Sequence, residues 1–476
     1  MNFDRRSLLR GLGAAGATAM IPGMATATDG DPASGRFLID LREVDRADVP
    51  DEVEVVHDIS EIDLLAARGD PAAVPGVDST TPDVTVYQDG AGAVPENAGP
   101  VAEVDRDGAA GGDPAWDAGL TNNELQWDKR AQRLGDLSDR PDERRTVHDT
   151  TTGEGARVAV IDSGVSDAHP DLADAVNADL SANFTTDPYD FRPNGAGDHG
   201  THVAGTVAAT NATGDGVLGT APDAEVVSLR VFSGVAGATG DVIAAIVDAA
   251  NKGCDVANLS LGYPVPYVDP EEFPWLLSVK EAYERAAAHA RKRGMLVVNS
   301  AGNDGIDMDA EGVLSLPTEV EGVFGVSATG PIGYLWDDRK QREDLALKRL
   351  EDPTSSPAFY TNYGSAVDLS AAGGDADLDA AADGADGWYY DLVLSTVVSP
   401  DGDGGVVPGY GWKAGTSMAA PQVSGAVALV RSLRPDAGVA EVESLLRETA
   451  TDGEPGGEQY HGAGHLDLRS LVKAAR

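Results

Sequence analysis

Short apolar runs recur along the chain from residue 158 to residue 398, and most of them end at Gly, Ser, Asn or Asp. The runs occupy residues 158–161, 224–232, 254–261, 295–301, 323–329, 366–371 and 392–398. Runs of this length without polar alternation are typical of strands buried on both faces of a parallel sheet. Helical patterns lie near 239–252 and 276–293. This alternation predicts an α/β domain with a mainly parallel sheet and helices on both faces.

Two candidates for chemistry lie at the starts of predicted helices. Ser417 is part of GTSMAAP, residues 415–421, directly ahead of an apolar, Ala-rich run. A serine at a helix start has its own backbone N–H and the positive helix end beside its hydroxyl, where acyl transfer develops negative charge. His199 opens a second helical pattern, residues 198–210, which is rich in Gly and Ala. An isolated histidine is more often structural, so His199 gains meaning only together with other groups.

Two further candidates follow predicted strands. Asp162 ends the run at 158–161, and Asn303 lies in the Gly-containing loop after the run at 295–301. In open α/β sheets, sites usually form at the carboxyl ends of the strands. An Asn after Gly is also common in turns that have no chemical role. Because all four groups fall at strand ends or helix starts, we interpret them as nucleophile, base, orienting acid and oxyanion donor.

Five motifs resemble, in sequence and order, the motif set of the subtilisin-like serine proteases. They are VIDSGV, HGTHVAGT, SLG at residues 260–262, SAGN at residues 300–303, and GTSMAAP, and the resemblance covers roughly residues 120–476. It implies a subtilisin-like three-layer domain with the Asp, His, Ser chain order of that family's triad. A related branch of this fold carries a glutamate in place of the histidine, and His199 argues against that branch.

The resemblance implies a role for each candidate. Ser417 would attack a peptide carbonyl, His199 would take its proton and pass it to the leaving amine, and Asp162 would fix the imidazole. The Asn303 amide and the Ser417 backbone N–H would hold the oxyanion. His202 is interpreted as structural, because the family's motif places the base at the first histidine.

The resemblance also implies where a polypeptide substrate binds. Residues 260–262 would pair with the substrate backbone, and residues 300–302 would form one wall of the primary specificity pocket. The predicted contacts are Ser260, Leu261, Gly262, Ser300, Ala301, Gly302 and, at the pocket floor, Ser315. A serine at the floor would shorten the pocket. Glu319 and Glu321 lie nearby and could favour basic side chains or simply be solvated, which leaves the side-chain preference open.

No cofactor is expected for catalysis, but the resemblance points to structural calcium. Asp171 matches a calcium-ligand position of the family, and the loop at 210–216 lies where the family wraps the same ion. Asp215 could supply a carboxylate and Asn211 a carbonyl oxygen, both suitable for this hard cation. A plain Gly/Asn turn with a helix-capping aspartate would account for the same residues.

The charge balance indicates where the protein works. Its 79 acidic residues outnumber 35 basic ones, which gives a formal net charge of −44. Such a surface repels itself at low ionic strength, whereas at about 1 M salt a Debye length of roughly 3 Å screens the repulsion. The composition therefore indicates a halophile, and we interpret the chain as haloarchaeal. It has no basic stripe to bind a phosphate backbone, which excludes nucleic acid as a partner.

The first 27 residues are typical of export. Residues 4–9, DRRSLL, resemble a twin-arginine signal, and cleavage is expected near residues 25–27. The Gly/Ala-rich stretch between them contains Arg10 and Pro22, and no other segment reaches the roughly 18 apolar residues of a membrane span. We therefore expect a secreted protein without stable membrane insertion. Its lone cysteine, Cys254, cannot form an internal disulfide and is interpreted as a small buried residue.

The regions between the predicted signal peptide and the catalytic domain have less distinctive sequence patterns. Residues 30–87 contain four apolar runs separated by Asp, Pro and Gly, enough for a small α+β unit, and their position implies an inhibitory and chaperone prodomain. Residues 88–118, rich in Gly, Ala and Asp, are predicted to be a flexible linker with the maturation point. The catalytic domain is expected at 120–476, with insertions at 336–352 and 373–387.

Two functions agree with these patterns. The first is a secreted, monomeric serine endopeptidase made as a zymogen, which hydrolyses polypeptides and is inhibited by its own prodomain. The second is a catalytically silent subtilase scaffold that binds partners at the cell surface. Silent members normally lose a triad residue, and none is lost here, which favours the enzyme.

Overall fold

The structure is a computed structural model, and it describes residues 33–476 with gaps. The gaps are residues 77–78, 89–97, 104–124, 136–145, 196, 213, 215, 264–268, 332–352, 385–386, 403–404 and 454. The predicted signal peptide at 1–27, the insertion at 336–352 and most of the linker at 88–118 therefore lie outside the described residues.

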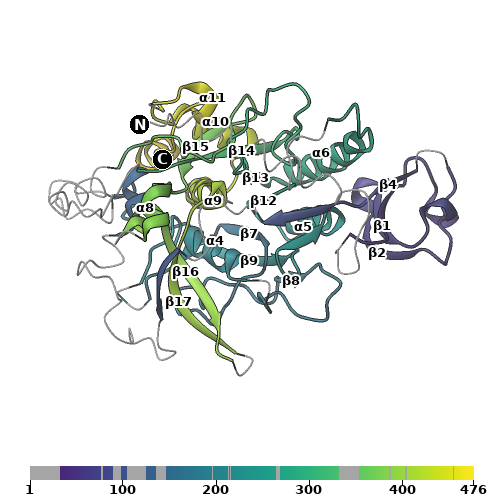
Figure 1. Ribbon diagram of the computed structural model, residues 1–476, viewed down its shortest axis with the longest axis horizontal. Helices are drawn as coiled ribbons and strands as arrows, with labels where there is room; N and C mark the ends of the chain where they lie inside the picture. The colour runs from purple at the N-terminus through teal and green to yellow at the C-terminus, as the bar shows by residue number, and fades with distance from the viewer. Residues whose placement is uncertain are drawn as a thin grey trace.

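A seven-stranded sheet crosses the molecule, and every neighbouring pair of its strands is parallel (Figure 1). In spatial order the strands are β15 (Leu369–Ala372), β14 (Val323–Thr329), β13 (Leu296–Ser300), β11 (Val256–Leu259), β7 (Arg157–Asp162), β9 (Glu225–Arg230) and β8 (Ala182–Asn183). The predicted mainly parallel sheet is confirmed. The short strand β8 was not predicted, because it has no apolar run of its own.

Helices cover both faces of this sheet (Figure 1). One face carries α4 (His199–Ala208) and α9 (Thr416–Leu433), and the other carries α5 (Thr239–Asn251) and α6 (Trp275–Arg293). In β7, Val158 and Val160 belong to the core beneath α4 and α9, whereas Ile161 belongs to the core beneath α5 and α6. Burial on both sides explains why the strands lack polar alternation. The three-layer α/β fold is therefore confirmed.

The other described helices that follow residue 125 have ten residues or fewer. They are α3 (Trp127–Ala131), α8 (Leu378–Asp383), α10 (Val439–Glu448), α11 (Glu458–His461), α12 (Leu468–Ala475) and the 3-10 turn η6 (Trp388–Asp391). None of the helices in these described ranges combines the length and apolar character that a bilayer span requires. Cys254 is buried and unpaired, and burial raises the pKa of its thiol to about 12, which makes it inert.

Residues 33–88, called the N-terminal unit below, form a small antiparallel sheet at one end of the molecule (Figure 1). Its strand order is β2 (Glu54–Ile59), β3 (Leu64–Arg68), β1 (Arg36–Asp40) and β4 (Thr80–Pro82). Its described helical turns are the 3-10 helices η2 (Arg46–Asp48), η3 (Ser60–Ile62) and η4 (Pro71–Ala73). The sheet packs on α5 and α6, because Leu38, Leu64 and Ala66 share a core with those helices.

The last strand of the N-terminal unit pairs with the large domain. This strand, β5 (Thr85–Gln88), lies antiparallel between β10 (Ala236–Ala238) and β12 (Leu261–Gly262). Its residue Val86 is fully buried in the core beneath α5. The edge of β12 is therefore occupied by a strand of the same chain.

A long hairpin packs beside α4 (Figure 1). It consists of β16 (Val393–Pro400) and β17 (Val406–Lys413), and β6 (Ala98–Glu103), within the predicted linker, pairs with β17. Gly205 allows the hairpin to approach α4, because a Cβ there would lie 2.2 Å from Oγ1 of Thr396. The run at 392–398 thus forms a hairpin strand outside the central sheet, and β6 was not predicted.

Candidate active site

Asp162 and His199 meet where β7 ends and α4 begins. The two carboxylate oxygens of Asp162 lie 2.9 and 3.0 Å from Nδ1 of His199, and the carboxylate is fully buried. Gly200 makes this contact possible, because a Cβ at that position would lie 2.5 Å from the carbonyl oxygen of Gly164. The backbone N–H of Gly200 also donates to Oγ of Ser163 at 2.9 Å. The glycine after the histidine therefore lets the helix start reach the strand end.

The second ring nitrogen of His199 is available for proton transfer. Nε2 is buried and has no hydrogen-bond partner among the described residues. Because a carboxylate accepts hydrogen bonds, the pairing with Asp162 assigns the ring proton to Nδ1 and leaves a lone pair on Nε2. The imidazole can therefore accept a proton from a group placed beside Nε2.

Ser417 is the second residue of α9 and is fully buried. Its carbonyl oxygen accepts a hydrogen bond from Oγ of Ser260 at 3.0 Å, and its own Oγ lies 3.5 Å from the carbonyl oxygen of Ser260. The preceding residue, Thr416, accepts from the N–H of Gly302 at 3.1 Å through Oγ1. The first turn of α9 is thus fixed to the segments that follow β11 and β13.

Asn303 presents its amide nitrogen without a partner. Its Oδ1 accepts from the N–H of Thr416 at 2.8 Å and from Oγ1 of Thr416 at 2.9 Å. Its Nδ2 is buried and has no hydrogen-bond partner in the described part of the chain. Buried donors of this kind are rare and call for a ligand or a chemical role. An oxyanion beside Nδ2 would satisfy it.

Six of the seven predicted substrate contacts line one cavity. Its walls are Leu261, Gly262, Tyr263, Ser300, Ala301, Gly302, Asp304, Ser315, Leu316, Thr318 and Asn362. The seventh predicted contact, Ser260, is not part of this wall and instead holds Ser417.

The acidic residues near the cavity differ from those that the sequence indicated. Glu319 binds the backbone N–H of Ser315 through Oε2, and neither Glu319 nor Glu321 contributes to the cavity wall. Asp304 contributes instead, although the sequence had not marked it. It follows Asn303 directly, and its place in a GN turn resembles ordinary turn chemistry.

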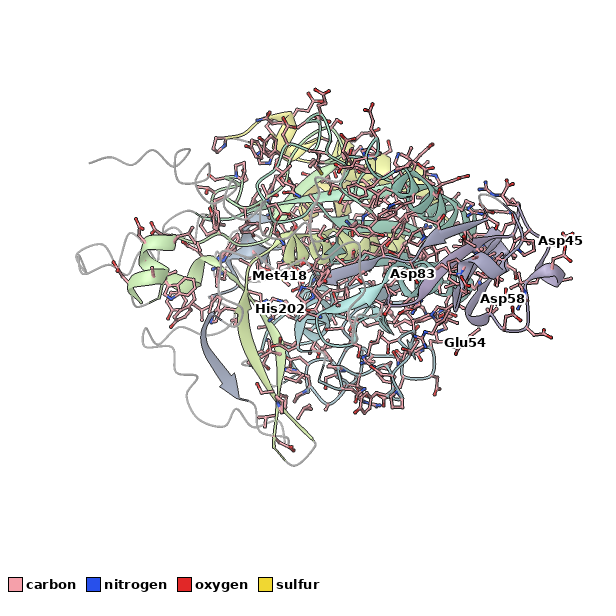
Figure 2. The ribbon with its side chains drawn as sticks, turned by 45° about the vertical axis from the view of Figure 1, so that its right-hand side comes forward. Asp45, Glu54, Asp58, Asp83, His202 and Met418 are labelled. Atoms are coloured by element: carbon pink, nitrogen blue, oxygen red, sulfur yellow. The ribbon has the colours of Figure 1, made fainter. Side chains whose placement is uncertain are left out.

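His202 has a structural environment, as interpreted from the sequence. Its Nε2 lies 3.1 Å from the carbonyl oxygen of Val393 in the hairpin. Burial, followed by the charge of Lys413, lowers the pKa of His202 well below its usual value, so the ring is neutral. Figure 2 shows His202, on α4, and Met418, on α9, in the middle of the molecule.

The predicted calcium ligands do not fit a cation in the part of the chain that is described. Asp171 is fully buried, and its oxygens accept hydrogen bonds from the N–H groups of Ala212 at 2.8 Å and Val217 at 3.2 Å. The Tyr410 hydroxyl donates to it at 2.8 Å. Calcium requires several converging oxygen acceptors, whereas these groups are donors that already compensate the carboxylate.

The other two predicted ligands give the same result. Oδ1 of Asn211 accepts from the N–H of Gly216 at 2.7 Å, and Asp215 lies outside the described residues. Among the described residues, no group of three or more His, Cys, Asp or Glu side chains is arranged to hold a metal. The plain-turn alternative therefore describes Asp171 and Asn211 better than a calcium site.

One residue that supports the site gave no signal in the sequence. Asn362 accepts through Oδ1 from the N–H groups of Asp304 at 3.0 Å and Ile306 at 3.1 Å, and its Nδ2 donates to the carbonyl oxygen of Ala301 at 3.0 Å. It fixes the loop after β13 from a segment far away in the chain, so no local pattern marks it.

The chain is similar in sequence to known proteins. Residues 153–464 match the model of the Subtilase family. Subtilisin Savinase of Lederbergia lenta is 31% identical over 326 residues, which cover 68% of this chain and 92% of that protein. An alkaline protease of Alkalihalobacillus alcalophilus is also 31% identical over 326 residues, and the match spans 65% of that relative's length.

The fold is also similar to that of solved structures. Fervidolysin of Fervidobacterium pennivorans, a keratinolytic enzyme related to subtilisin, aligns with 94% of this chain and 62% of its own, with a TM-score of 0.64. Its 23% identity makes this a likeness of fold. Since the family model covers more than half of the chain, this protein belongs to the subtilase family of serine endopeptidases.

Proposed function

We propose that the chain is a secreted serine endopeptidase that hydrolyses peptide bonds with Asp162, His199 and Ser417. The observation that carries the proposal is a pair of buried nitrogen atoms without partners among the described residues, Nε2 of His199 and Nδ2 of Asn303. The first is an acceptor and the second a donor. Acyl transfer needs both beside its nucleophile, one for the hydroxyl proton and one for the oxyanion.

The proposed reaction follows from these positions. Oγ of Ser417 attacks the peptide carbonyl carbon while Nε2 of His199 takes the hydroxyl proton, and Asp162 holds the imidazolium through Nδ1–H. His199 then gives the proton to the leaving amine, and the acyl group remains on Ser417. Water repeats the two steps and releases the acid. Nδ2 of Asn303 and the N–H of Ser417 donate to the oxyanion in each step.

The N-terminal unit is proposed to inhibit this site before maturation. β5 pairs with β12 on one side and with β10 on the other. It therefore occupies the edge of β12, where the substrate backbone is proposed to pair. A substrate that binds by strand addition would have to displace it. We therefore propose a prodomain at 30–87 that acts as inhibitor and folding chaperone, a maturation point in the linker at 88–118, and a catalytic domain at 120–476.

A buried ionic cluster attaches the N-terminal unit to α5. Arg36 of β1 lies 2.9 Å from Asp83 and 2.7 Å from Asp241, and the exposed fractions of the three side chains are 0, 0 and 2%. Asp83 also accepts from the N–H of Gly240 at 3.0 Å, at the start of α5. A Cβ on Gly240 would lie 2.7 Å from Cβ of Ala66. Arg36 thus compensates two carboxylates in a contact that Gly240 keeps open.

We propose further that the protein is exported through a twin-arginine signal at 1–27 and works as a monomer in molar salt, as haloarchaeal secreted subtilases would. The support is the DRRSLL segment and the net charge of −44. Figure 2 shows Asp45, Glu54 and Asp58 on the N-terminal unit, with Asp45 at its outer end.

Replacing Ser417 with Ala removes the proposed nucleophile. Casein hydrolysis should fall by at least about 10⁴-fold, and the precursor should stay uncleaved, because the remaining groups have no atom to attack with. Gel analysis and a peptidase assay in molar salt measure both effects. Ser424→Ala, later on α9, is the control. Normal processing and activity in the Ser417 variant would refute Ser417 as the nucleophile, whereas a wild type without either would leave the binding scaffold.

Replacing Arg36 with Met should loosen the N-terminal unit. Two buried carboxylates would lose their cation, a change that costs about 3 kcal/mol or more. The delay between cleavage of the precursor and the onset of activity should therefore shorten. Arg42→Met is the control, because Arg42 pairs with Asp40 and Glu281 at the surface. An equal delay in all three proteins would contradict the proposed attachment.

Salt should stabilise the folded protein. Raising NaCl from about 0.2 M to about 2 M shortens the Debye length to a few Å and screens the acidic surface, so the melting temperature should rise. Calorimetry at neutral pH measures the change. KCl at equal ionic strength should act alike, because screening does not depend on ion identity. A melting temperature that falls or stays constant would disprove adaptation to high salt.

Chelation should not destabilise the Asp171 region. EDTA at constant salt should leave the melting temperature unchanged, whereas Tyr410→Phe should lower the free energy of unfolding by about 1 kcal/mol through loss of one hydrogen bond to a carboxylate. Tyr189→Phe, at an exposed side chain, is the control. A melting temperature lowered by EDTA and restored by calcium would reinstate the calcium site.

A further inference from the structure

One carboxylate lines the cavity beside the candidate active site. The cavity wall combines Leu261 and Gly262 of β12 with the segment after β13, and this segment contributes Asp304. The same segment contains Asn303, whose oxygen is bound to Thr416 in the first turn of α9. The cavity wall therefore includes the residues on both sides of Asn303, and Asp304 is the acidic side chain within its described wall.

The backbone of Asp304 is held in place. Its N–H donates to Oδ1 of Asn362 at 3.0 Å, and Asn362 also fixes Ala301 and Ile306 on either side. Gly302 accommodates the arrangement, because a Cβ there would lie 2.3 Å from Nδ2 of Asn362. A side chain mounted on such a fixed loop keeps its charge at a defined position of the wall.

The Asp304 carboxylate is accessible but has no counter-charge. No hydrogen bond or ion pair to its oxygens is formed by any residue in the described ranges. Its side chain remains exposed to solvent, while the surrounding cavity walls raise the pKa of Asp304 to about 6 by desolvation. Because the carboxylate has no protein partner among the described residues and is open to solvent, a cation that enters the cavity can reach it.

The other carboxylate near this cavity is differently arranged. Glu319 binds the backbone N–H of Ser315 and so contributes to holding the cavity floor. It already has a donor, whereas Asp304 has none among the described residues. Asp304 is therefore the group that a ligand side chain entering the cavity would encounter with an unmet negative charge.

We propose that Asp304 makes this cavity select a cationic side chain, lysine or arginine, on the acyl side of the cleaved peptide bond. The proposal rests on the proposed endopeptidase function. The backbone of a substrate paired with β12 would point this side chain between β12 and the segment after β13. Its ammonium or guanidinium group would then meet the Asp304 carboxylate, in a partly enclosed place where the pair is screened less than at the surface.

Two peptide amides that differ at one position test the proposal. The position before the cleaved bond is Lys in one and Met, of similar length but uncharged, in the other. At one fixed salt concentration the mature wild type should cleave the Lys peptide with at least about tenfold higher kcat/KM, as expected for a hydrogen bond to a charged group. Asp304→Asn should remove that preference, because kcat/KM for the Lys peptide should fall by a larger factor than kcat/KM for the Met peptide.

Matched variants separate a local contact from the general acidic field. Asp307→Asn removes the same charge from the same segment but outside the cavity wall, and it should keep the preference for Lys. Asp304→Lys should instead favour a peptide with Glu at the same position. A preference that survives in Asp304→Asn, or that is lost equally in Asp307→Asn, would overturn the role of Asp304.

The failure of this proposal differs from the failure of the proposed function. A wild type that cleaves both peptides with equal kcat/KM would contradict the selectivity alone. A mature wild type that cleaves neither of them nor casein would contradict the endopeptidase itself.

Discussion

The first turn of α9 is hydrogen-bonded to the segments that follow two neighbouring strands, and the geometry of the site depends on these bonds. Ser260, after β11, donates to the carbonyl oxygen of Ser417, and Asn303, after β13, accepts from the N–H of Thr416. β11 and β13 are adjacent and parallel, so their carboxyl ends meet at one edge. The bond to Thr416 uses the oxygen of the Asn303 amide, so its nitrogen stays without a partner among the described residues and can serve the proposed oxyanion contact.

The candidate catalytic groups could be singled out from the sequence because each belongs to a local pattern, a strand end or a helix start. The hydrogen-bond partners of the other polar groups could not be predicted, because these partners come from distant segments of the chain. Asp171 shows the difference: its position indicated calcium, but Tyr410, 239 residues further on, donates to it. The same holds for Asp304, whose environment is made by Asn362 and by β12. Such pairings depend on packing between elements, for which a periodic pattern carries no information.

Salt acts differently on the two kinds of charge in this protein. The many surface carboxylates repel one another, and added ions weaken that repulsion. Arg36 and its two carboxylate partners are almost entirely buried, so mobile ions cannot reach them. Surface pairs such as Arg42 with Glu281 lose strength in molar salt, whereas the buried cluster keeps it. The attachment of the N-terminal unit can therefore persist in the same solvent that stabilises the fold.

The contacts that attach the N-terminal unit and the cavity that would select a substrate side chain lie in different places, although both involve β12. β5 binds β12 through its backbone, and the N-terminal unit gains further stability from the core beneath α5 and from Arg36. A substrate has only the strand edge and the cavity beside it. While the linker is intact, β5 also benefits from a high effective concentration, which an external peptide lacks. The proposed cleavage in the linker would remove that advantage without changing the cavity. The residues that govern release and those that govern side-chain preference can therefore vary independently.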